Sequence, residues 1–549
     1  MISKIRQGGI KGKSRNYSEF LLDMDDDIVD APTIKDGTPP GSLAHSDNTM
    51  FILYPNGWKE KNNNQTNVSL YYESLLNALI NKSLINEFYN EDLTFIGPYT
   101  FSYFKKLKKV HLPNVTEISS RSFVHNESLE EVILESITEI PDCAFSDATY
   151  NSIPEVYPIN ANYRNKCRNA LKKIYAPNVT SIGDGAFAYC TGLMDIDIPN
   201  ATIIDQGAFY YCKGLKSVDL PNATNIGFGA FRDCSSLKDI SLPNATSIYD
   251  NVFINCGSLT DISLPNVTSI GDYAFGYCTA MIDVSLPNAT SIGNYAFDHC
   301  LNLMNVSLPN TTSIGDKAFM GCSGLTDVSL PNATIIGDYA FNTCTNLESI
   351  NLPNASSIDT YAFAYCSSLT NINIPNASSI GDLAFYRCNN LTDISLPSTT
   401  NISHSVFNSC VRLKNVNLPN AISIGNNTFY NCISLTDVSL PSVTSIGTTV
   451  FAYCAILKLI NASAIKSIAA NSLKNIPSLE SIYLKSCTTI AKNSFSGNTG
   501  LLDIYLPNAQ NTYTNAPWGA VNATIHYECE FNEDGIPLEL LEEEQEEGE

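Results

Sequence analysis

The chain has 549 residues, 44% of them hydrophobic, and a formal net charge of -23. Its longest apolar run is far below the roughly 18 residues of a membrane-spanning helix, so the sequence predicts no membrane span. The acidic balance also argues against broad contact with nucleic acid phosphates, which requires clustered Lys and Arg.

The first 60 residues lack the pattern of a folded core. Residues 4–15 carry five basic side chains and no acidic one, and an acidic run follows at 23–30. No apolar stretch of about 7 to 15 residues follows the basic segment, as a secretory signal would require. We therefore expect synthesis in the cytoplasm, and we interpret residues 1–60 as a flexible or docking segment that could attach the protein to a partner.

Residues 61–92 have the pattern of a capping helix. Leu75, Leu76, Leu79 and Ile80 fall on one helical face. A stack of repeats needs such a cap, because its first coil would otherwise expose its apolar interior. We predict a helical N-terminal cap here.

A repeat of 22 residues occupies residues 93–507, about eighteen copies in all. Each unit is built around a bulky apolar residue, usually Phe, and in thirteen consecutive units a Cys stands three residues after a Phe. Between Phe145 and Phe187 the spacing is 42, one period plus 20 residues, which indicates an inserted loop at about 149–168. Self-similarity at this period is the signature of a solenoid, in which each coil stacks on its neighbours.

Each coil has one clear strand signal. In residues 195–198 polar and apolar side chains alternate, which predicts a half-buried strand, and Pro199 ends it. The Asn after the Pro favours a turn. The remaining stretch, such as residues 271–278, has the length of one or two helical turns, and the Gly at its start suits a tight or positive-φ corner. We predict that each coil consists of strand, turn and short helix.

The cysteine ladder is expected to be buried and reduced. An odd ladder cannot pair completely, in-register stacking disfavours the disulfide dihedral angle, and no short CxxC-type spacing indicates zinc. We interpret these thiols as packing residues. The ladder consists of Cys190, Cys212, Cys234, Cys256, Cys278, Cys300, Cys322, Cys344, Cys366, Cys388, Cys410, Cys432 and Cys454.

The units have the form AFxxCxxLxxIxLPxxxxxIGxx over about residues 93–507. This pattern resembles the BspA-type, or Treponema pallidum type, leucine-rich repeats. The resemblance implies a right-handed α/β solenoid with a parallel β-sheet on one face and short helical turns on the other. It also implies use in attachment and recognition, by bacteria, mucosal protozoa or phage-encoded virion proteins.

No catalytic machinery is visible in the sequence. The six His residues are scattered, and there is no HExxH motif, nucleophile motif or phosphate-binding loop. His299 and His404 are expected at the surface. We predict that the protein is not an enzyme and that it needs no cofactor or metal.

The outward strand positions, eight and ten residues after Phe, form the first candidate binding surface. Carboxylates in register along a sheet could bind a hard cation or a polycationic partner. Simple alternation of polar and buried residues is the competing explanation. The nine candidates are Asp195, Asp197, Asp219, Asp239, Asp261, Asp283, Asp327, Asp393 and Asp437.

Tyrosines two residues before or after Phe form the second candidate surface. Exposed aromatic side chains on a rigid frame could stack on sugars or anchor a protein, and they could equally cover the Phe layer. These residues are Tyr189, Tyr211, Tyr273, Tyr277, Tyr295, Tyr339, Tyr361, Tyr365 and Tyr453.

Beyond the repeat, residues 508–527 are expected to form a C-terminal cap, with Trp518 as its plug. Residues 528–549 carry eleven acidic side chains and no basic one, so we predict an acidic tail.

These features favour a non-enzymatic recognition or adhesion protein that presents its long repeat surface to a protein or glycan on a cell surface. A phage tail-associated receptor-binding protein, released by lysis, is the specific case that the missing secretory signal favours. The alternative is an intracellular structural or regulatory scaffold for protein–protein interactions.

Overall fold

The structure is a computed structural model. It describes residues 86–146 except 99, 103 and 105, residues 170–541, and the backbone of three strands between residues 43 and 60. The basic arm, nearly all of the expected helical cap, the insertion at 149–168 and the end of the acidic tail lie outside these residues. The chain forms two compact units, Met1–Asn266 and Val267–Glu549, and each is described by itself.

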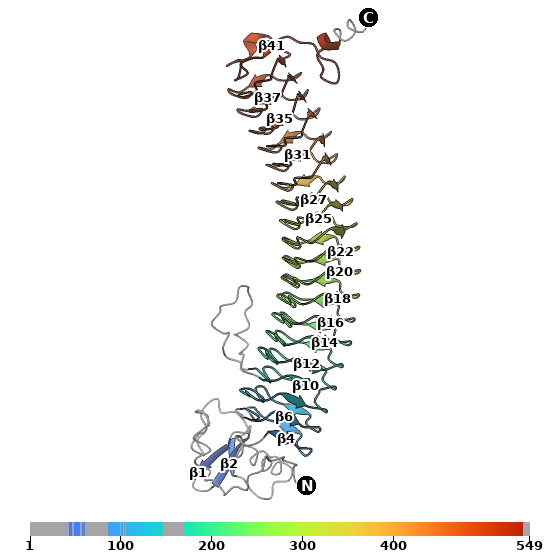
Figure 1. The fold of residues 1–549 in the computed structure, drawn as a ribbon, viewed down its shortest axis with the longest axis vertical. Coiled ribbons are helices and arrows are strands. Elements are labelled where there is room, and N and C mark those ends of the chain that lie inside the picture. The colour runs from blue at the N-terminus through green and yellow to red at the C-terminus, as the bar shows by residue number, and fades with distance from the viewer. Residues whose placement is uncertain are drawn as a thin grey trace. The chain divides into compact units, whose positions relative to one another are not determined.

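Three strands near the N-terminus form a small antiparallel sheet in the order β1-β2-β3 (Figure 1). Leu43 pairs with Ile52, and Phe51 pairs with Glu60. The composition of residues 1–60 did not predict this sheet. Its strands are β1 (Leu43–Ser46), β2 (Thr49–Tyr54) and β3 (Gly57–Glu60).

In the first unit each coil contributes one three-residue strand and one two-residue strand, and within the unit these lie as successive rungs (Figure 1). The three-residue strands are β4 (Glu87–Tyr89), β6 (Lys109–His111), β8 (Glu131–Ile133), β10 (Lys173–Tyr175), β12 (Asp195–Asp197), β14 (Ser217–Asp219), β16 (Asp239–Ser241) and β18 (Asp261–Ser263). The two-residue strands are β5 (Phe95–Ile96), β7 (Glu117–Ile118), β9 (Glu139–Ile140), β11 (Ser181–Ile182), β13 (Ile203–Ile204), β15 (Asn225–Ile226) and β17 (Ser247–Ile248).

The second unit repeats this plan. Its three-residue strands are β20 (Asp283–Ser285), β22 (Asn305–Ser307), β24 (Asp327–Ser329), β26 (Ser349–Asn351), β28 (Asn371–Asn373), β30 (Asp393–Ser395), β32 (Asn415–Asn417), β34 (Asp437–Ser439), β36 (Leu459–Asn461), β38 (Ser481–Tyr483), β40 (Asp503–Tyr505) and β41 (Thr524–His526). Its two-residue strands are β19 (Ser269–Ile270), β21 (Ser291–Ile292), β23 (Ser313–Ile314), β25 (Ile335–Ile336), β27 (Ser357–Ile358), β29 (Ser379–Ile380), β31 (Asn401–Ile402), β33 (Ser423–Ile424), β35 (Ser445–Ile446), β37 (Ser467–Ile468) and β39 (Thr489–Ile490).

The strands pair in parallel with the register of the sequence repeat. Ile174 pairs with Ile196, and Val306 pairs with Val328, in each case 22 residues apart. Across the insertion, Val132 pairs directly with Ile174. The predicted parallel solenoid is therefore confirmed, with nineteen three-residue strands from β4 to β40 in the described residues where about eighteen coils were expected.

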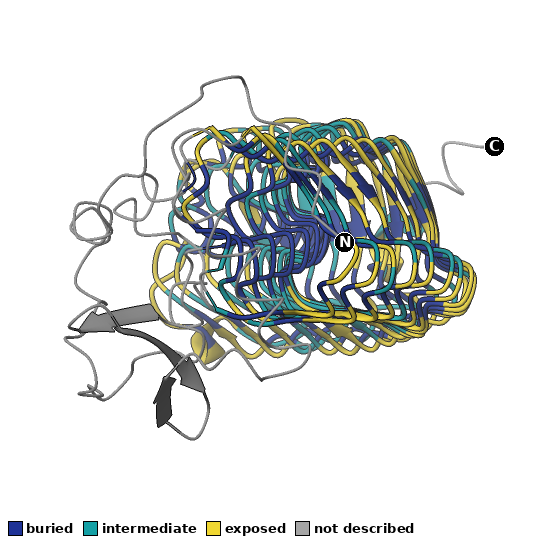
Figure 2. Cartoon of the chain, turned by 90° about the horizontal axis from the view of Figure 1, so that it is seen from below, coloured by how far each residue is buried: buried dark blue, intermediate teal, exposed yellow. Residues whose placement is uncertain are grey.

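The core lies inside the coils, as Figure 2 shows by the dark blue of buried residues and the yellow of exposed ones. Phe rings stack from coil to coil; the centroids of Phe297 and Phe319, for example, are 5.1 Å apart and their planes differ by 3°. All thirteen ladder cysteines are buried, as predicted. Their role exceeds packing, because the Sγ of Cys300 donates a hydrogen bond to the carbonyl oxygen of Phe275 at 3.2 Å.

The corner after the strand is stabilised by a second ladder. The Asn that follows the Pro donates its Nδ2–H to the Pro carbonyl oxygen of the preceding coil. Asn332 Nδ2 donates to the carbonyl oxygen of Pro309 at 2.7 Å. In the coil where Ser398 replaces the Asn, the Ser398 hydroxyl donates to the carbonyl oxygen of Pro375 at 2.8 Å. The Asn at this corner thus joins neighbouring coils as well as forming the turn.

The short helix predicted for each coil is wrong. The amides of Tyr273, Phe275 and Tyr277, two residues apart, donate to carbonyls of the next coil at 2.7 to 2.9 Å. An α-helix needs these amides for its own i−4 carbonyls, so this ladder excludes one. Among the described residues, helix is limited to the 3-10 turn η3 (Gln510–Thr512) and a helical turn at 538–541.

The role expected for the corner glycine also needs correction. Gly227 does not have a positive φ; a Cβ there would lie 2.8 Å from the backbone of Asp205 and Gln206 in the preceding coil. Glycine is needed at this position because two coils approach closely. The positive φ occurs two residues later, at Gly229 (58°).

The described end of the second unit is closed by non-repeat residues. Trp518 is 1% exposed, as expected of a plug, and its carbonyl oxygen accepts a hydrogen bond from the amide of Phe495. Beyond β41 the chain contacts earlier coils, since Lys485 Nζ donates to the carbonyl oxygen of Asn532 at 2.7 Å. Asn461 Nδ2 donates to the carbonyl oxygen of Asp534 at 2.9 Å. The first part of the acidic segment therefore packs on the solenoid.

Candidate functional site

The strand face has the exposure that the sequence predicted. All nine candidate Asp residues on the three-residue strands are exposed, whereas the aliphatic residue between the two outward positions is buried or nearly so. In the first unit Asp239 pairs in register with Asp261, so two exposed carboxylates occupy neighbouring strands. The repeat thus places these carboxylates on one side of the sheet within each unit.

Neighbouring polar side chains engage several of these carboxylates. Asn305 Nδ2 donates to Asp283 Oδ1 at 2.6 Å, and Lys173 Nζ lies 3.3 Å from Asp195 Oδ2. Hydrogen bonds from Thr392 and Asn415 hold the pKa of Asp393 below its usual value. Within the described residues, no group of three or more His, Cys, Asp and Glu side chains could hold a metal ion. The hard-cation hypothesis therefore receives no support from the geometry.

The strand face changes its chemistry at the ends of the array. In the first coils of the first unit it carries paired charges, with Lys109 Nζ 2.7 Å from Glu131 Oε2. Directly before the strands, Lys172 Nζ lies 3.0 Å from Glu130 Oε2. In the last coils of the second unit it becomes aromatic, and Tyr505 stacks on the ring of His526 at 4.3 Å. The dominance of Asp, Ser and Asn is a property of the coils between these ends.

The nine candidate tyrosines share a backbone feature that the sequence did not predict. All of them have positive φ, between 55° and 67°. For an L-residue with a bulky side chain, this left-handed region costs roughly 1–2 kcal/mol. Their exposure differs: Tyr365 and Tyr453 are exposed, most are half-buried, and Tyr189 is buried against Tyr210. Tyr189 therefore does not belong to an exposed aromatic surface.

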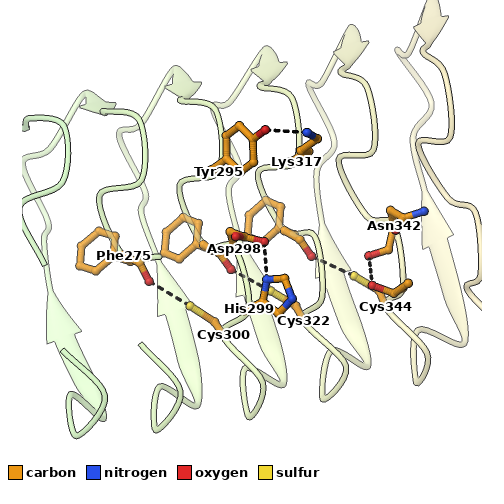
Figure 3. A network of polar contacts seen from close by, with 12 residues as sticks. Phe275, Tyr295, Asp298, His299, Cys300, Lys317, Cys322, Asn342 and Cys344 are labelled. Carbon is orange, nitrogen blue, oxygen red and sulfur yellow. Dashed lines mark hydrogen bonds and ion pairs between the residues drawn. The ribbon is translucent and has the colours of Figure 1, made fainter. Parts of the chain in front are cut away.

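Five consecutive coils of the second unit form what we call the tyrosine strip. It consists of the residues two positions before Phe, namely Tyr273, Tyr295, Lys317, Tyr339 and Tyr361. Tyr273 stacks on Tyr295 at 4.3 Å, and Tyr339 stacks on Tyr361 at 4.7 Å. Lys317 lies between the two pairs, and its Nζ donates to the hydroxyl oxygen of Tyr295 at 2.5 Å (Figure 3).

A polar pair lies on the other side of the Phe in the coil of residues 295–300. His299 Nδ1 is 2.7 Å from Oδ1 of Asp298, which is buried (Figure 3). Burial raises the pKa of the Asp298 carboxyl, although the neighbouring His299 opposes this shift. The His299 ring stacks on Tyr277 at 5.2 Å and lies over Gly321, where a Cβ would come within 3.0 Å of it.

His404 is exposed, as predicted, and belongs to a backbone-supporting ladder. Its Nδ1 accepts a hydrogen bond from the amide of Asn426 at 2.9 Å. In other coils a carboxylate has this place: Asp316 Oδ1 accepts from the amide of Asp338 at 3.0 Å. The sequence did not predict this ladder of backbone amides and side-chain acceptors. It also did not identify Lys317 as a site residue, although a single Lys in a column of tyrosines could have indicated it.

The stacked coils with an aliphatic strand and a Phe interior define a leucine-rich repeat solenoid. The chain belongs to the BspA type leucine rich repeat region family, which matches residues 74–164, 158–282, 246–355, 312–427 and 422–518. The family predicted from the repeat pattern is thus confirmed. A search of curated proteins finds no match to this sequence.

Several solved structures resemble the chain. A leucine-rich repeat protein from Bacteroides ovatus has 20% identity, covers 81% of this chain and 96% of its own, and gives a TM-score of 0.37. A leucine rich cell surface protein from Faecalibacterium prausnitzii has 22% identity, with 68% and 94% covered and a TM-score of 0.31. The T. pallidum leucine rich repeat protein has 22% identity, with 37% and 91% covered and a TM-score of 0.26.

No helix among the described residues has both the length and the apolar character to cross a membrane. The comparisons give no support to an association with phage tails, so that part of the expectation stays a prediction.

Proposed function

We propose that this protein is a non-enzymatic adhesion or recognition protein that binds a protein partner through the exposed strand face. The observation that carries the proposal is the register of exposed carboxylates, represented by Asp239 beside Asp261. A rigid sheet presents them without the loss of conformational freedom that a flexible segment would incur on binding. Membership in a leucine-rich repeat family fits a protein-binding role.

Charge defines the partner that suits this face. Five of the exposed Asp residues lie in four successive coils of the first unit, between Asp195 and Asp261. Such a face attracts a basic partner surface and repels an acidic one, which sets association rate and specificity more than affinity. We therefore assign a basic protein surface, rather than a neutral glycan, to the strand face.

The test uses the full chain, labelled and applied to intact bacterial cells, mucosal glycans and immobilised host proteins. The variant replaces five strand-face residues with Asn: Asp195, Asp197, Asp219, Asp239 and Asp261. A matched control replaces five Glu of the tail with Gln, namely Glu542, Glu543, Glu544, Glu546 and Glu547, which changes the net charge equally.

An association rate constant for a protein surface that falls at least about tenfold in the Asp variant but not in the tail control supports the proposal. Equal losses in both variants would mean that net charge alone is responsible. Unchanged binding in the Asp variant would remove the strand face as the site.

A further inference from the structure

The tyrosine strip is not a requirement of the fold. The same position has glycine in three coils of the first unit, at Gly185, Gly207 and Gly229, all with positive φ. The coil after the strip has Leu383 there, and later coils of the second unit have Ser405, Asn427, Thr449 and Asn471, all with positive φ. Glycine and asparagine tolerate this backbone region, whereas Tyr and Lys do so at a cost. Four Tyr and one Lys in five consecutive coils therefore indicate a role for the side chains.

The stacking geometry disfavours one role that the sequence suggested, the stacking of sugars. The rings of Tyr273 and Tyr295 differ by 10° in plane, and those of Tyr339 and Tyr361 by 9°. The ring faces therefore point along the stack, from coil to coil, and within each pair one face of each ring is covered by its partner. A sugar ring needs a wide aromatic face open to solvent, whereas a cation can bind at the remaining ring face that looks toward the next coil, as Lys317 does beside Tyr295.

The chain itself places a cation in this gap. The ammonium of Lys317 lies 4.7 Å from the Tyr295 ring centroid and 5.5 Å from that of Tyr339, and it donates to the Tyr295 hydroxyl. Lys317 is the only Lys or Arg between residues 267 and 386, a stretch with nine Asp and Glu. The one cation of this region is thus located between two pairs of tyrosines.

Other tyrosines of the same backbone type also have cations beside them. Lys213 Nζ lies 4.2 Å from the Tyr211 ring centroid, and the Arg387 guanidinium carbon lies 5.8 Å from that of Tyr365. Tyrosine in these left-handed positions therefore receives Lys and Arg side chains more than once in this chain.

Carboxylates border the strip. Asp272, Asp316 and Asp338 directly precede three of its residues; Asp316 is exposed and the other two are half-buried. Each accepts a backbone amide of the next coil at 2.7 to 3.0 Å, which fixes the carboxylate beside the strip. A cation on the strip would thus find both a phenol and a carboxylate.

We propose that the tyrosine strip is a second binding surface, separate from the strand face, and that it binds an Arg-rich segment of a protein partner. The position of Lys317 beside Tyr295 and Tyr339 is an example, within the chain, of a cationic side chain bound to the strip. Arg suits the site better than Lys, because a planar guanidinium both stacks against aromatic rings and forms two parallel hydrogen bonds to a carboxylate.

The experiment titrates the full chain with fluorescein-labelled nona-arginine at physiological salt and measures anisotropy; nona-lysine of equal charge is the comparison. The variant Tyr273→Asn with Tyr361→Asn leaves the net charge and Lys317 unchanged, and Asn already occurs at this backbone position in Asn427. The control, Tyr249→Asn with Tyr453→Asn, removes two exposed tyrosines outside both the strip and the three-residue strands.

We expect nona-arginine to bind more tightly than nona-lysine, and the strip variant to raise its Kd about five- to tenfold while the control leaves it unchanged. Replacement of the same two residues by Phe retains the stacked rings, and so keeps the test valid if the Asn variant unfolds; loss of the hydroxyls should weaken binding by a smaller factor.

Equal binding by wild type and both strip variants would overturn the proposal, as would an equal loss in the control. The strand-face Asp variant is titrated in parallel. If only that variant loses affinity, the strip proposal fails and the strand-face proposal stands, so the two outcomes remain distinguishable.

Discussion

The thiol of Cys322 donates a hydrogen bond to the carbonyl oxygen of Phe297 in the preceding coil, with a Sγ–O distance of 3.1 Å. The same carbonyl oxygen accepts the amide of Cys300, three residues later in its own coil. Other ladder cysteines, such as Cys344 and Cys388, likewise donate to a buried Phe carbonyl oxygen of the preceding coil. This role explains why a small residue with a donor recurs at a position that packing alone would leave open to Ala or Val.

Removal of this donor should destabilise the second unit. Cys322→Val keeps approximately the volume but leaves the Phe297 carbonyl with one partner fewer, so we expect a loss of about 1–2 kcal/mol in the free energy of unfolding. Cys322→Ser retains a hydroxyl donor and should lose less. Urea denaturation followed by circular dichroism measures both, with Cys529→Ser, outside the ladder, as control. A Val variant as stable as the Ser variant would show that the hydrogen bond is unimportant.

The ladder thiols should make the fold sensitive to alkaline pH. Burial raises the pKa of Cys366, Cys410 and Cys454 to about 12, from an ordinary value of 9.0. Since the folded pKa is the higher one, the stabilisation is complete below pH 9. It decreases as pH rises toward 12, because only the unfolded chain then loses these protons.

Each such thiol should lower the free energy of unfolding by about 1.4 kcal/mol per pH unit above its unfolded pKa. Denaturant titrations at several values from pH 7 to 11 measure this slope, and Cys366→Ser should reduce it. A stability that does not change between pH 9 and 11 would contradict the assignment.

Gly227 and Gly229 lie in one coil but need to be glycine for different reasons, close approach of the preceding coil at Gly227 and positive φ at Gly229. Gly227→Ala brings a Cβ within 2.8 Å of the Asp205 and Gln206 backbone, so we expect a loss of about 1–3 kcal/mol from overpacking. Gly229→Ala meets only ordinary contacts, at 3.7 Å from the Arg232 Cβ, and should lose about 1 kcal/mol from its left-handed backbone. Thermal unfolding compares the two. A Gly229 variant less stable than the Gly227 variant would reverse the argument.

The corner ladder predicts a simple substitution pattern. Asn332→Ala removes the hydrogen bond to the Pro309 carbonyl oxygen and should lower the free energy of unfolding by about 1 kcal/mol. Asn332→Ser should be close to wild type, because Ser398 and Ser442 already form the equivalent bond. Chemical denaturation of the two variants checks this, and an Ala variant equal to the Ser variant would disprove the role of the ladder.

The sequence by itself determined the coil, because its period sets the register. A residue at position i must lie beside i+22, as Ile240 beside Ile262 shows, so the buried Phe and Cys columns and the exposed Asp column follow from alternation and spacing alone. The family was readable for the same reason. The sequence also placed Tyr295 and Lys317 in one column, since they are one period apart.

Only the tertiary structure decided the conformation between the strands. The amides of Tyr273 and Phe275 bond to the next coil and not to their own, and no local pattern distinguishes that choice from a short helix. This inter-coil ladder places left-handed backbone on both sides of Phe, and in the strip it brings the tyrosines into stacked pairs. The repeat decides which residues share a column. The hydrogen bonds between coils form only when the coils are stacked, so the conformation and contacts of each column depend on the folded structure.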